Sequence, residues 1–440
     1  MAKKGLTKGW QSVAAAGLAG VILLMLPVRA NASLLTANDT PFPSSKVIVG
    51  ARWESIRYSP PANQWGDILP TVWAADGNQY TMIDDGGADV PLPGGIWRQS
   101  VAKITGTPPK IHITHVGNPN APPPHTFTQI RADPSLWLGP LGPYYSSGLL
   151  AVGHVLFATE ENDWNWKANG PFTGLHGVAV SINEGTTWTS PSLSFPAPLG
   201  NLSWVIRAKG GYFPDGWAYA IASEREFNAN NLILGRAHPD IADITDPSKW
   251  QWQTGWENGE PVFSSSFQNA VPIVSWPSHL TYPQMAYDAP LGRYLLTFTY
   301  SFISTPPGVW TDGADLVILE APHPWGPFSF VAQEPKFGPS NGYAAGFPVK
   351  WISPNGRDVW LKWSANFDGC GAKLDCAGGY GFNYRQIHLT LAGDHSEPSR
   401  RVRGRRAAAG AASGHEAAAN TAAAPRPVEV KHRLRLLPRR

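Results

Sequence analysis

Short apolar runs separated by turn-forming residues dominate the central part of the sequence. The runs are rich in β-branched and aromatic residues and are bounded by Gly, Pro, Asn or Asp, as strands joined by tight turns are. No long stretch repeats its apolar residues with a period of 3.6, so long amphipathic helices are not expected. The pattern predicts one all-β domain over residues 33–391, and a meandering body of this size suits a β-propeller, whose radial blades protect strand edges. The clearest runs are 110–115, 148–158, 177–182, 216–222, 231–237, 293–300, 314–320 and 359–363.

The first 32 residues have the pattern of a signal peptide. Three lysines precede an apolar run over residues 13–26, and Ala30-Asn31-Ala32 fits the small-residue rule for cleavage. The alternative is an uncleaved anchor, but the apolar run is short for a membrane span of about 20 residues. We therefore expect a secreted protein with no membrane association after cleavage.

Residues 392–440 form a tail of different composition. From residue 391 onward there is no Trp, Phe or Tyr, and Ala, Arg and Pro dominate. Such a segment cannot bury enough apolar surface to order itself, so we expect a disordered tail. The tail carries a net charge of +7 and the signal peptide carries +4. Because the formal net charge of the whole chain is +3, residues 33–390 carry a net charge of −8. An acidic body argues against nucleic-acid binding.

The stretch 65–87, WGDILPTVWAADGNQYTMIDDGG, predicts a β-hairpin. Two runs rich in β-branched and aromatic residues flank Asp-Gly-Asn at 76–78, which is turn chemistry. If these three residues are the whole loop, Ala75 pairs with Gln79. The two ends of the hairpin, which carry acidic residues, then return to the same edge of the sheet.

On this register the hairpin brings two candidate catalytic residues together, Asp67 and Asp85. Leu69 lies opposite Asp85, which places Asp67 one diagonal step away on the same face, about 7–8 Å apart at Cα. Glycosidases hold their two carboxyl groups roughly 5–5.5 Å or 6.5–9.5 Å apart. Asp84 is expected on the opposite face. A two-residue turn would instead separate Asp67 and Asp85 onto opposite faces, so the hypothesis depends on the turn length.

Further candidate residues for binding a sugar follow two predicted strands. Glu161, Asp163 and Trp164 combine acids with an aromatic ring, and Glu224 with Arg225 offers a charged pair that could hold hydroxyl groups. Sugar rings lie on aromatic faces while polar groups bind their edges. The alternative is that the carboxylates are merely solvated and that most tryptophans pack in the core.

Two motifs bear on the fold rather than on catalysis. Residues 181–188, SINEGTTW, match the Asp-box S-x-D-x-G-x-T-W with Asn183 in the Asp position, and 353–360 is a looser version. In such a turn the Asn side chain holds the backbone, Gly takes a left-handed conformation and Trp packs beneath. Residues 338–342 match G-x-S-x-G, but prolines surround the match and no helix follows, so an ordinary loop is expected.

Cys370 and Cys376 are the only cysteines. In an exported protein they predict one disulfide. Two cysteines without matching histidines argue against a zinc site. No metal and no organic cofactor is expected.

The residues GDILPTVWAADGNQYTMIDDGG, SEREF, YPQMAYDAPLGRYLLTF, WISPNGRDVWLKWSANF and YGFNYRQIHL resemble the secreted endo-D-arabinanases of glycoside hydrolase family 183. The resemblance covers roughly residues 53–391. That family has two aspartates eighteen positions apart across the first stretch, which Asp67 and Asp85 match. The resemblance implies a five-bladed propeller, with about 70 residues per blade. The number five rests partly on the resemblance.

The resemblance also implies a function. It predicts cleavage of furanosidic linkages in cell-wall α-D-arabinan by two carboxylates, with a polysaccharide as substrate and a monomeric enzyme. One alternative is a carbohydrate-binding, lectin-like propeller without turnover. A second is a sialidase, although the Arg-Ile-Pro start of sialidases is absent and the body has few arginines for a carboxylate-binding triad.

Overall fold

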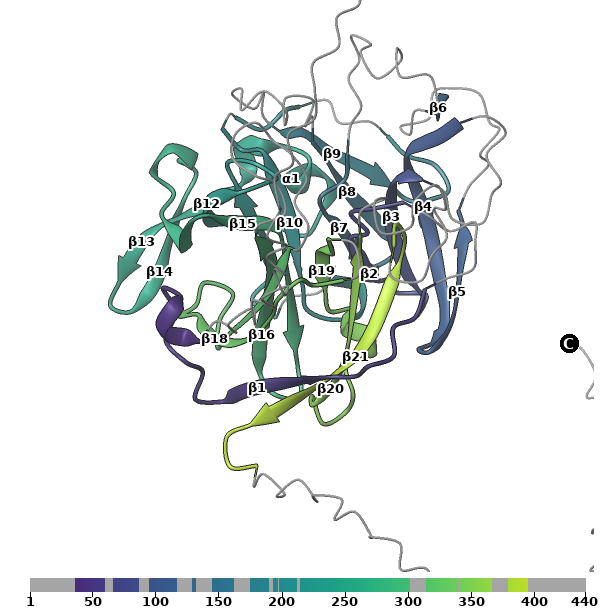
Figure 1. Cartoon of the computed structure of the whole chain (residues 1–440). Coiled ribbons are helices and arrows are strands. Elements are labelled where there is room, and N and C mark those ends of the chain that lie inside the picture. The colour runs from purple at the N-terminus through teal and green to yellow at the C-terminus, as the bar shows by residue number, and fades with distance from the viewer. Residues whose placement is uncertain are drawn as a thin grey trace, which may run out of the picture. The chain divides into compact units, whose positions relative to one another are not determined.

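The computed structural model describes residues 36–59, 66–86, 95–116, 129–131, 145–161, 175–189, 193–196, 198–211, 214–300, 314–338, 341–365 and 379–394. Regular structure in these ranges is almost entirely β-strand, and the only α-helix among them, α1, is the single turn Ile241–Ile244. Short 3₁₀ turns cover Ala37–Asp39, Lys209–Gly211, Pro247–Lys249, Phe267–Asn269 and Val349–Trp351. The prediction of an all-β body is confirmed (Figure 1).

The strands of the described ranges form four sheets, which we describe as five sets by dividing the nine-stranded sheet between β10 and β15. Each set is named after one strand, which we call its innermost strand. The β2 set contains β2 (Thr71–Trp73), β3 (Gln79–Gly86), β4 (Gly95–Thr107), β5 (Lys110–His115) and β6 (Gln129–Arg131). The β7 set contains β7 (Leu149–Val152), β8 (Val155–Glu161) and β9 (Leu175–Ser181). The β10 set contains β10 (Asn201–Ile206), β11 (Ala218–Ser223), β12 (Ala229–Ala237), β13 (Gln251–Glu257) and β14 (Glu260–Ser264).

The last two sets complete the body. The β15 set contains β15 (Pro272–Asp288), β16 (Arg293–Tyr300), β17 (Asp315–Ala321) and β18 (Ser329–Glu334). The β19 set contains β19 (Tyr343–Gly346), β20 (Asp358–Ser364), β21 (Asn383–Leu391) and β1 (Ile48–Trp53). The β10 and β15 sets share one nine-stranded sheet, because β10 and β15 pair in parallel through Val205↔Met285 and Ile206↔Ala286. The predicted count of five blades therefore stays a prediction.

Apolar clusters join each set to its neighbours. One cluster joins the β2, β7 and β10 sets, with Met82, Phe157 and Trp204 as members. A second joins the β10 set to the β15 set through residues such as Ile221 and Leu296. Each strand shows its apolar side chains to the next sheet, which is how sheets stacked face to face bury their area.

Two further clusters close the succession of sets. One joins the β15 set to the β19 set, for example through Ile318 and Leu361. The other joins the β19 set back to the β2 set, with Phe382 against Ile104. The innermost strands of all five sets are therefore brought toward one common region, which is where a site shared between sheets can form.

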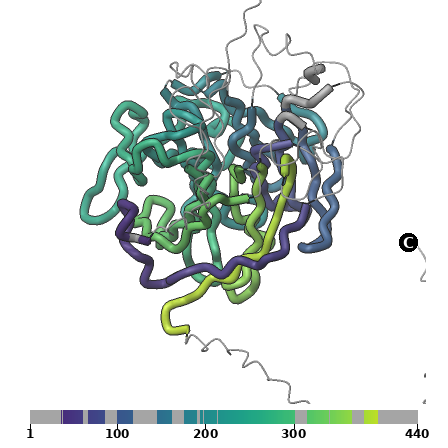
Figure 2. Tube along the Cα trace, in the orientation of Figure 1, coloured from purple at the N-terminus to yellow at the C-terminus, as the bar shows by residue number. Residues whose placement is uncertain are grey.

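The N-terminal strand β1 completes the last set. It pairs antiparallel with β21 from Ile48↔Leu391 to Trp53↔Ile387, and Figures 1 and 2 show this purple segment lying along the yellow C-terminal strand. Ile48 is fully buried in the cluster between the β15 and β19 sets. Residues from both ends of the body thus share one sheet, which covers an edge that β21 would otherwise expose.

The turn predicted at 181–188 is confirmed. Oδ1 of Asn183 accepts a 2.9 Å hydrogen bond from the backbone N–H of Thr187. Gly185 has a φ of +88°, and the buried Trp188 donates from Nε1 to the carbonyl of Gly185 at 3.0 Å. The G-x-S-x-G match at 338–342 leads into strand β19 and not into a helix, as expected.

Three predictions fall on residues outside the described ranges. They are the signal peptide at 1–32, the disulfide between Cys370 and Cys376, and the disordered tail, of which only residues 392–394 are described. They stay predictions.

Candidate active site

The hairpin turn has the predicted length but lies one residue earlier than predicted. β2 and β3 pair up to Trp73↔Gln79, and the backbone N–H of Ala74 donates to the carbonyl of Asn78 at 3.0 Å, which leaves residues 75–77 as the loop. The prediction that Ala75 pairs with Gln79 is therefore wrong. The physical reason is that Gly77 takes the left-handed conformation that ends a three-residue hairpin loop, with a φ of +87°, and Oδ1 of Asp76 accepts a 2.9 Å hydrogen bond from the backbone N–H two positions later.

At the other end of the hairpin, Asp67 pairs with Asp84. The backbone N–H of Asp67 donates to the carbonyl of Asp84 at 2.8 Å, and that of Asp84 donates back at 3.1 Å. Residues that exchange both bonds lie directly opposite, about 5.5 Å apart at Cα, with their side chains on one face. The prediction that Leu69 lies opposite Asp85 is wrong, and so is the placement of Asp84 on the face away from Asp67.

The earlier turn accounts for part of this change of register, and a local kink beside Asp67 adds a further shift. Ile68 and Leu69 have φ values of +59° and +56°, a left-handed conformation that is a genuine outlier for a β-branched residue. The kink shifts the register by one residue between Thr71↔Thr81 and Asp67↔Asp84. Asp85 is the next residue of β3. Its side chain lies outside the described part of the structure, and its catalytic role stays a prediction.

The carboxylate of Asp67 is held by the β19 set. Tyr343 is the first residue of β19, and its hydroxyl donates a 2.7 Å hydrogen bond to Oδ2 of Asp67. Asp67 as a whole residue is only partly buried, but Oδ1 of its carboxyl group is inaccessible to solvent. The hydrogen bond from Tyr343 therefore holds a largely enclosed carboxyl group in a fixed position. Sequence analysis missed Tyr343, because a contact across 276 positions leaves no local signal.

The carboxylate of Asp84 is held by the β7 set. Asp84 is fully buried, and its Oδ2 accepts a 2.7 Å hydrogen bond from the backbone N–H of Ser146, just ahead of β7. A charge-assisted bond of this length is among the stronger kinds in proteins. Asp84 therefore ties the hairpin to its neighbouring sheet.

Contacts of the same kind continue from set to set. The side-chain amide of Asn201, at the start of β10, lies 3.4 Å from Oε2 of Glu161 on β8. Phe227 of the β10 set meets Tyr282 of β15 with ring centroids 5.1 Å apart. Tyr282 then meets Tyr343 at 5.6 Å.

These contacts form a closed circuit at one end of the innermost strands. One partner from each set lies at or a few residues before the N-terminal end of its first-named strand, except Tyr282, which lies within β15. We call this region the mouth and define it by Asp67, Ser146, Asn201, Tyr282 and Tyr343. Each of the five sets contributes one residue to it, so the mouth is assembled from segments that lie far apart in the sequence.

Several residues at the mouth have a strained backbone. Besides Ile68 and Leu69, the φ values of Tyr282 and Ala344 are +46° and +49°. Ile68, Tyr282, Tyr343 and Ala344 belong to one small buried cluster. Non-glycine residues keep such conformations only where the surroundings impose them, and such residues gather at functional sites.

Buried acids surround the mouth. Glu161 and Glu226 are almost inaccessible to solvent, and so is Glu160. Burial raises the pKa of Glu160 to about 8, because the charged form is disfavoured away from water. Glu160 is therefore protonated in the folded protein near neutral pH.

The residues predicted to bind substrate have different environments. Glu161 is buried among the sheets. Oε1 of Glu224 accepts a 2.7 Å hydrogen bond from the backbone N–H of Asn230, which is a turn contact. Arg225 is partly exposed, and its Nε makes no hydrogen bond in the described structure. Asp163 and Trp164 lie outside the described residues.

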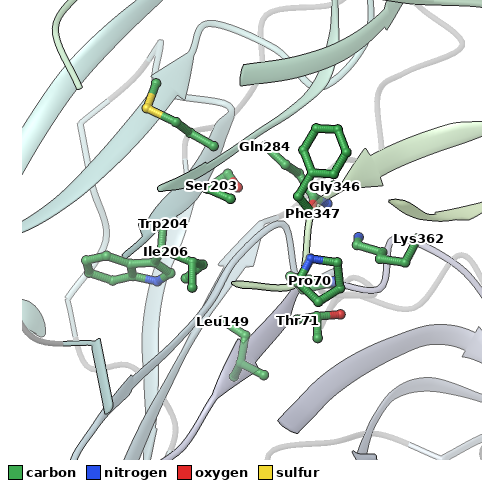
Figure 3. A pocket seen from close by; sticks show the side chains of 13 residues that line it. Pro70, Thr71, Leu149, Ser203, Trp204, Ile206, Gln284, Gly346, Phe347 and Lys362 are labelled. Atoms are coloured by element: carbon green, nitrogen blue, oxygen red, sulfur yellow. The ribbon is translucent and has the colours of Figure 1, made fainter. Parts of the chain in front are cut away.

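A cavity lies deeper along the same strands (Figure 3). Every set contributes to its lining, and several of the lining residues lie a few positions beyond the mouth residues on their strands. The lining includes Thr71, Leu149, Ser203, Gln284, Gly346 and Lys362. Lys362 is almost fully buried, and burial lowers its pKa well below the usual value.

Within the described ranges, no group of three or more His, Cys, Asp and Glu side chains is placed to hold a metal ion. No helix in those ranges is long and apolar enough to cross a membrane. The polar groups that gather at the mouth are carboxylates, a phenol and amides. Such groups can move protons and bind hydroxyls.

No protein-family model matches the sequence. No curated protein matches it either.

Several solved structures are similar in fold. A GH43_1 enzyme from Xanthomonas citri is 13% identical, with 76% of this chain and 92% of that chain covered and a TM-score of 0.42. An α-L-arabinofuranosidase from Clostridium thermocellum is 12% identical, with 68% and 81% covered and a TM-score of 0.37. The GH32 β-fructofuranosidase of Bombyx mori is 11% identical, with 78% and 65% covered and a TM-score of 0.43. With TM-scores below 0.5, these likenesses assign neither a family nor an activity to this chain.

Proposed function

We propose that this protein is a secreted glycoside hydrolase of the five-bladed propeller type, with its active site at the mouth. The substrate is a polysaccharide with furanosidic linkages, and the resemblance to family 183 points to the α-D-arabinan of cell walls. The observation that carries the proposal is the state of Asp67. Its carboxyl group is oriented by the hydroxyl of Tyr343 at 2.7 Å and lies in a hairpin with further aspartates.

The chemistry requires two carboxyl groups. One protonates the leaving oxygen of the glycosidic bond, and the other attacks the anomeric carbon or takes a proton from the water that does so. Asp67 and Asp85 are proposed for these roles. Asp84 is a poor candidate for direct contact with a sugar because it is fully buried and bonded to the backbone of Ser146.

The partly exposed residues near the mouth suit a sugar chain. Phe227 presents an aromatic ring beside Tyr282, and Arg225 adds a cation on the same loop. Rings of this kind contact the apolar face of a sugar, and guanidinium groups bind its hydroxyls. Glu161, Glu224, Asp163 and Trp164 complete the proposed set of residues that bind or surround the substrate.

The test is hydrolysis of a panel of arabinans and other polysaccharides, measured by the release of new reducing ends. We expect α-D-arabinan to be cleaved by the wild-type protein. Asp67→Asn and Asp85→Asn should each reduce turnover by a factor of roughly 10² to 10⁴ or more while the fold stays intact. Binding of a polysaccharide without any product would contradict the proposal and favour the lectin-like alternative.

A further inference from the structure

Two side chains of β20 hold the backbone on both sides of Asp67. The hydroxyl of Ser364 donates a 3.1 Å hydrogen bond to the carbonyl of Gly66, the residue before Asp67. Nζ of Lys362 donates a 3.3 Å hydrogen bond to the carbonyl of Ile68, the residue after it. Residues two apart on a strand point to the same face, so one face of β20 reaches both carbonyls.

The same lysine also holds the residue that orients Asp67. Nζ of Lys362 donates to the carbonyl of Ala344 at 2.8 Å. Ala344 follows Tyr343, whose hydroxyl binds Asp67. Tyr343 is in turn paired with Ser364 across β19 and β20. One pair of side chains therefore contacts the backbone next to both partners of the Asp67–Tyr343 hydrogen bond.

The residues that these side chains hold are strained. Ile68 and Ala344 both have left-handed φ values, +59° and +49°. Such conformations are unfavourable and persist only when neighbouring groups impose them. Lys362 contacts the carbonyl of each of them, and Ser364 is fully buried beside it.

We propose that Lys362 and Ser364 are positioning residues for catalysis, which set the place of Asp67 by holding the carbonyls on either side of it. This inference rests on the proposed function. Lys362 acts as a hydrogen-bond donor and not through its charge, because a neutral amine still carries two N–H groups for the two carbonyls. Neither residue touches the substrate, and both act through Asp67 and Tyr343.

The test uses two variants and a matched control. Lys362→Met removes the donor and keeps most of the side-chain volume, and Ser364→Ala removes one hydroxyl. The control is Ser45→Ala. Ser45 is also a buried serine, and its hydroxyl, ahead of β1, donates to Oε1 of Glu320 on β17 at 2.5 Å. All three changes remove a buried hydrogen bond, but only the first two involve the neighbours of Asp67.

Turnover and melting temperature are measured together for each variant. We expect kcat to fall roughly 10- to 100-fold in Lys362→Met and Ser364→Ala, since a small misplacement of a catalytic group has an effect of this size. KM should change by less than about threefold, because ground-state binding is not altered. Ser45→Ala should lower the melting temperature and leave kcat near the wild-type value. If all three variants lose stability alike and keep wild-type kcat, the inference is wrong.

Crystal structures of the variants provide a readout that does not depend on activity. In Lys362→Met and Ser364→Ala, Asp67 should move away from the hydroxyl of Tyr343, and Ile68 should relax toward negative φ. An unchanged Asp67–Tyr343 hydrogen bond in both variants would overturn the inference. If the wild-type protein cleaves no polysaccharide, the proposed function fails, and these structures still decide whether β20 positions Asp67. If Lys362→Met does not fold, Ser364→Ala alone decides it.

Discussion

The hydroxyl of Tyr343 donates a 2.7 Å hydrogen bond to Oδ2 of Asp67, and the two residues lie 276 positions apart in the sequence. This bond joins the first strand of the β19 set to the residue just before the β2 set. It holds the carboxyl group of Asp67 in one orientation. A group held in this way is arranged before any substrate arrives, which is what electrostatic preorganisation requires.

Tyr343→Phe is expected to lower kcat about tenfold or more while the ring contacts remain. The reason is that a hydrogen bond to a charged group is worth roughly 1.5–3 kcal/mol, and phenylalanine keeps the packing with Tyr282. The measurement is turnover on the cleaved polysaccharide beside the melting temperature. Tyr294→Phe, a buried tyrosine of β16, serves as the control. Equal turnover in the Tyr343→Phe and wild-type proteins would argue against a role for this bond.

Asp84 and Asp85 are expected to behave in opposite ways. Asp84→Ala should lower the free energy of unfolding by about 2–4 kcal/mol, because it leaves the buried N–H of Ser146 without its acceptor and opens a small cavity. Asp85→Asn should leave stability nearly unchanged and remove turnover. Chemical denaturation and reducing-end assays on both variants check this. If the Asp84→Ala protein were stable but inactive and the Asp85→Asn protein were active, Asp84 would be the catalytic residue and Asp85 would not.

The stability of the protein is expected to depend on pH through Glu160. Burial raises the pKa of this carboxyl from 4.5 to about 8. Between these values the unfolded chain releases the proton while the folded chain retains it, so the free energy of unfolding falls as the pH rises. The slope from one group is at most about 1.4 kcal/mol per pH unit. Below pH 4.5 both states are protonated and this loss is absent.

Glu160→Gln tests this dependence, because the amide cannot ionise. Between pH 4.5 and 8, the free energy of unfolding of the variant should fall less steeply with rising pH than that of the wild type. The difference in free energy of unfolding between the variant and the wild type should therefore grow toward pH 8 in favour of the variant. Urea denaturation at several pH values measures the effect. Identical slopes in the two proteins would show that Glu160 is ionised in the fold.

Strand β1 is expected to be necessary for a stable fold. Deletion of residues 36–53 uncovers the core around Ile48 and leaves β21 with an unpaired edge. The melting temperature should fall by roughly 10 °C or more, since several kcal/mol of burial are lost. The control is a chain that ends at Asp394, which should melt where the full-length protein does. A similar loss in the control would show that the tail packs on the body.

Local patterns in the sequence were sufficient for the strands and the short turns. A strand is indicated by apolar and β-branched residues at every second position, and a turn by Gly, Pro or Asn between two such runs. Both signals depend only on residues that are neighbours in the sequence. The turn at Asn183 and the strands β5 and β16 lie where the sequence placed them. The hairpin around Asp76 was also evident, because turn chemistry is a property of a few consecutive residues.

Tertiary structure alone decided how the site is assembled. The left-handed conformations of Ile68 and Leu69 shift the hairpin register and place Asp84 opposite Asp67. Nothing in the local sequence favours these conformations. Lys362 and Ser364 hold the adjacent carbonyls from almost 300 positions away. The energy that keeps a strained backbone in place comes from distant strands, and it exists only after the sheets have packed together.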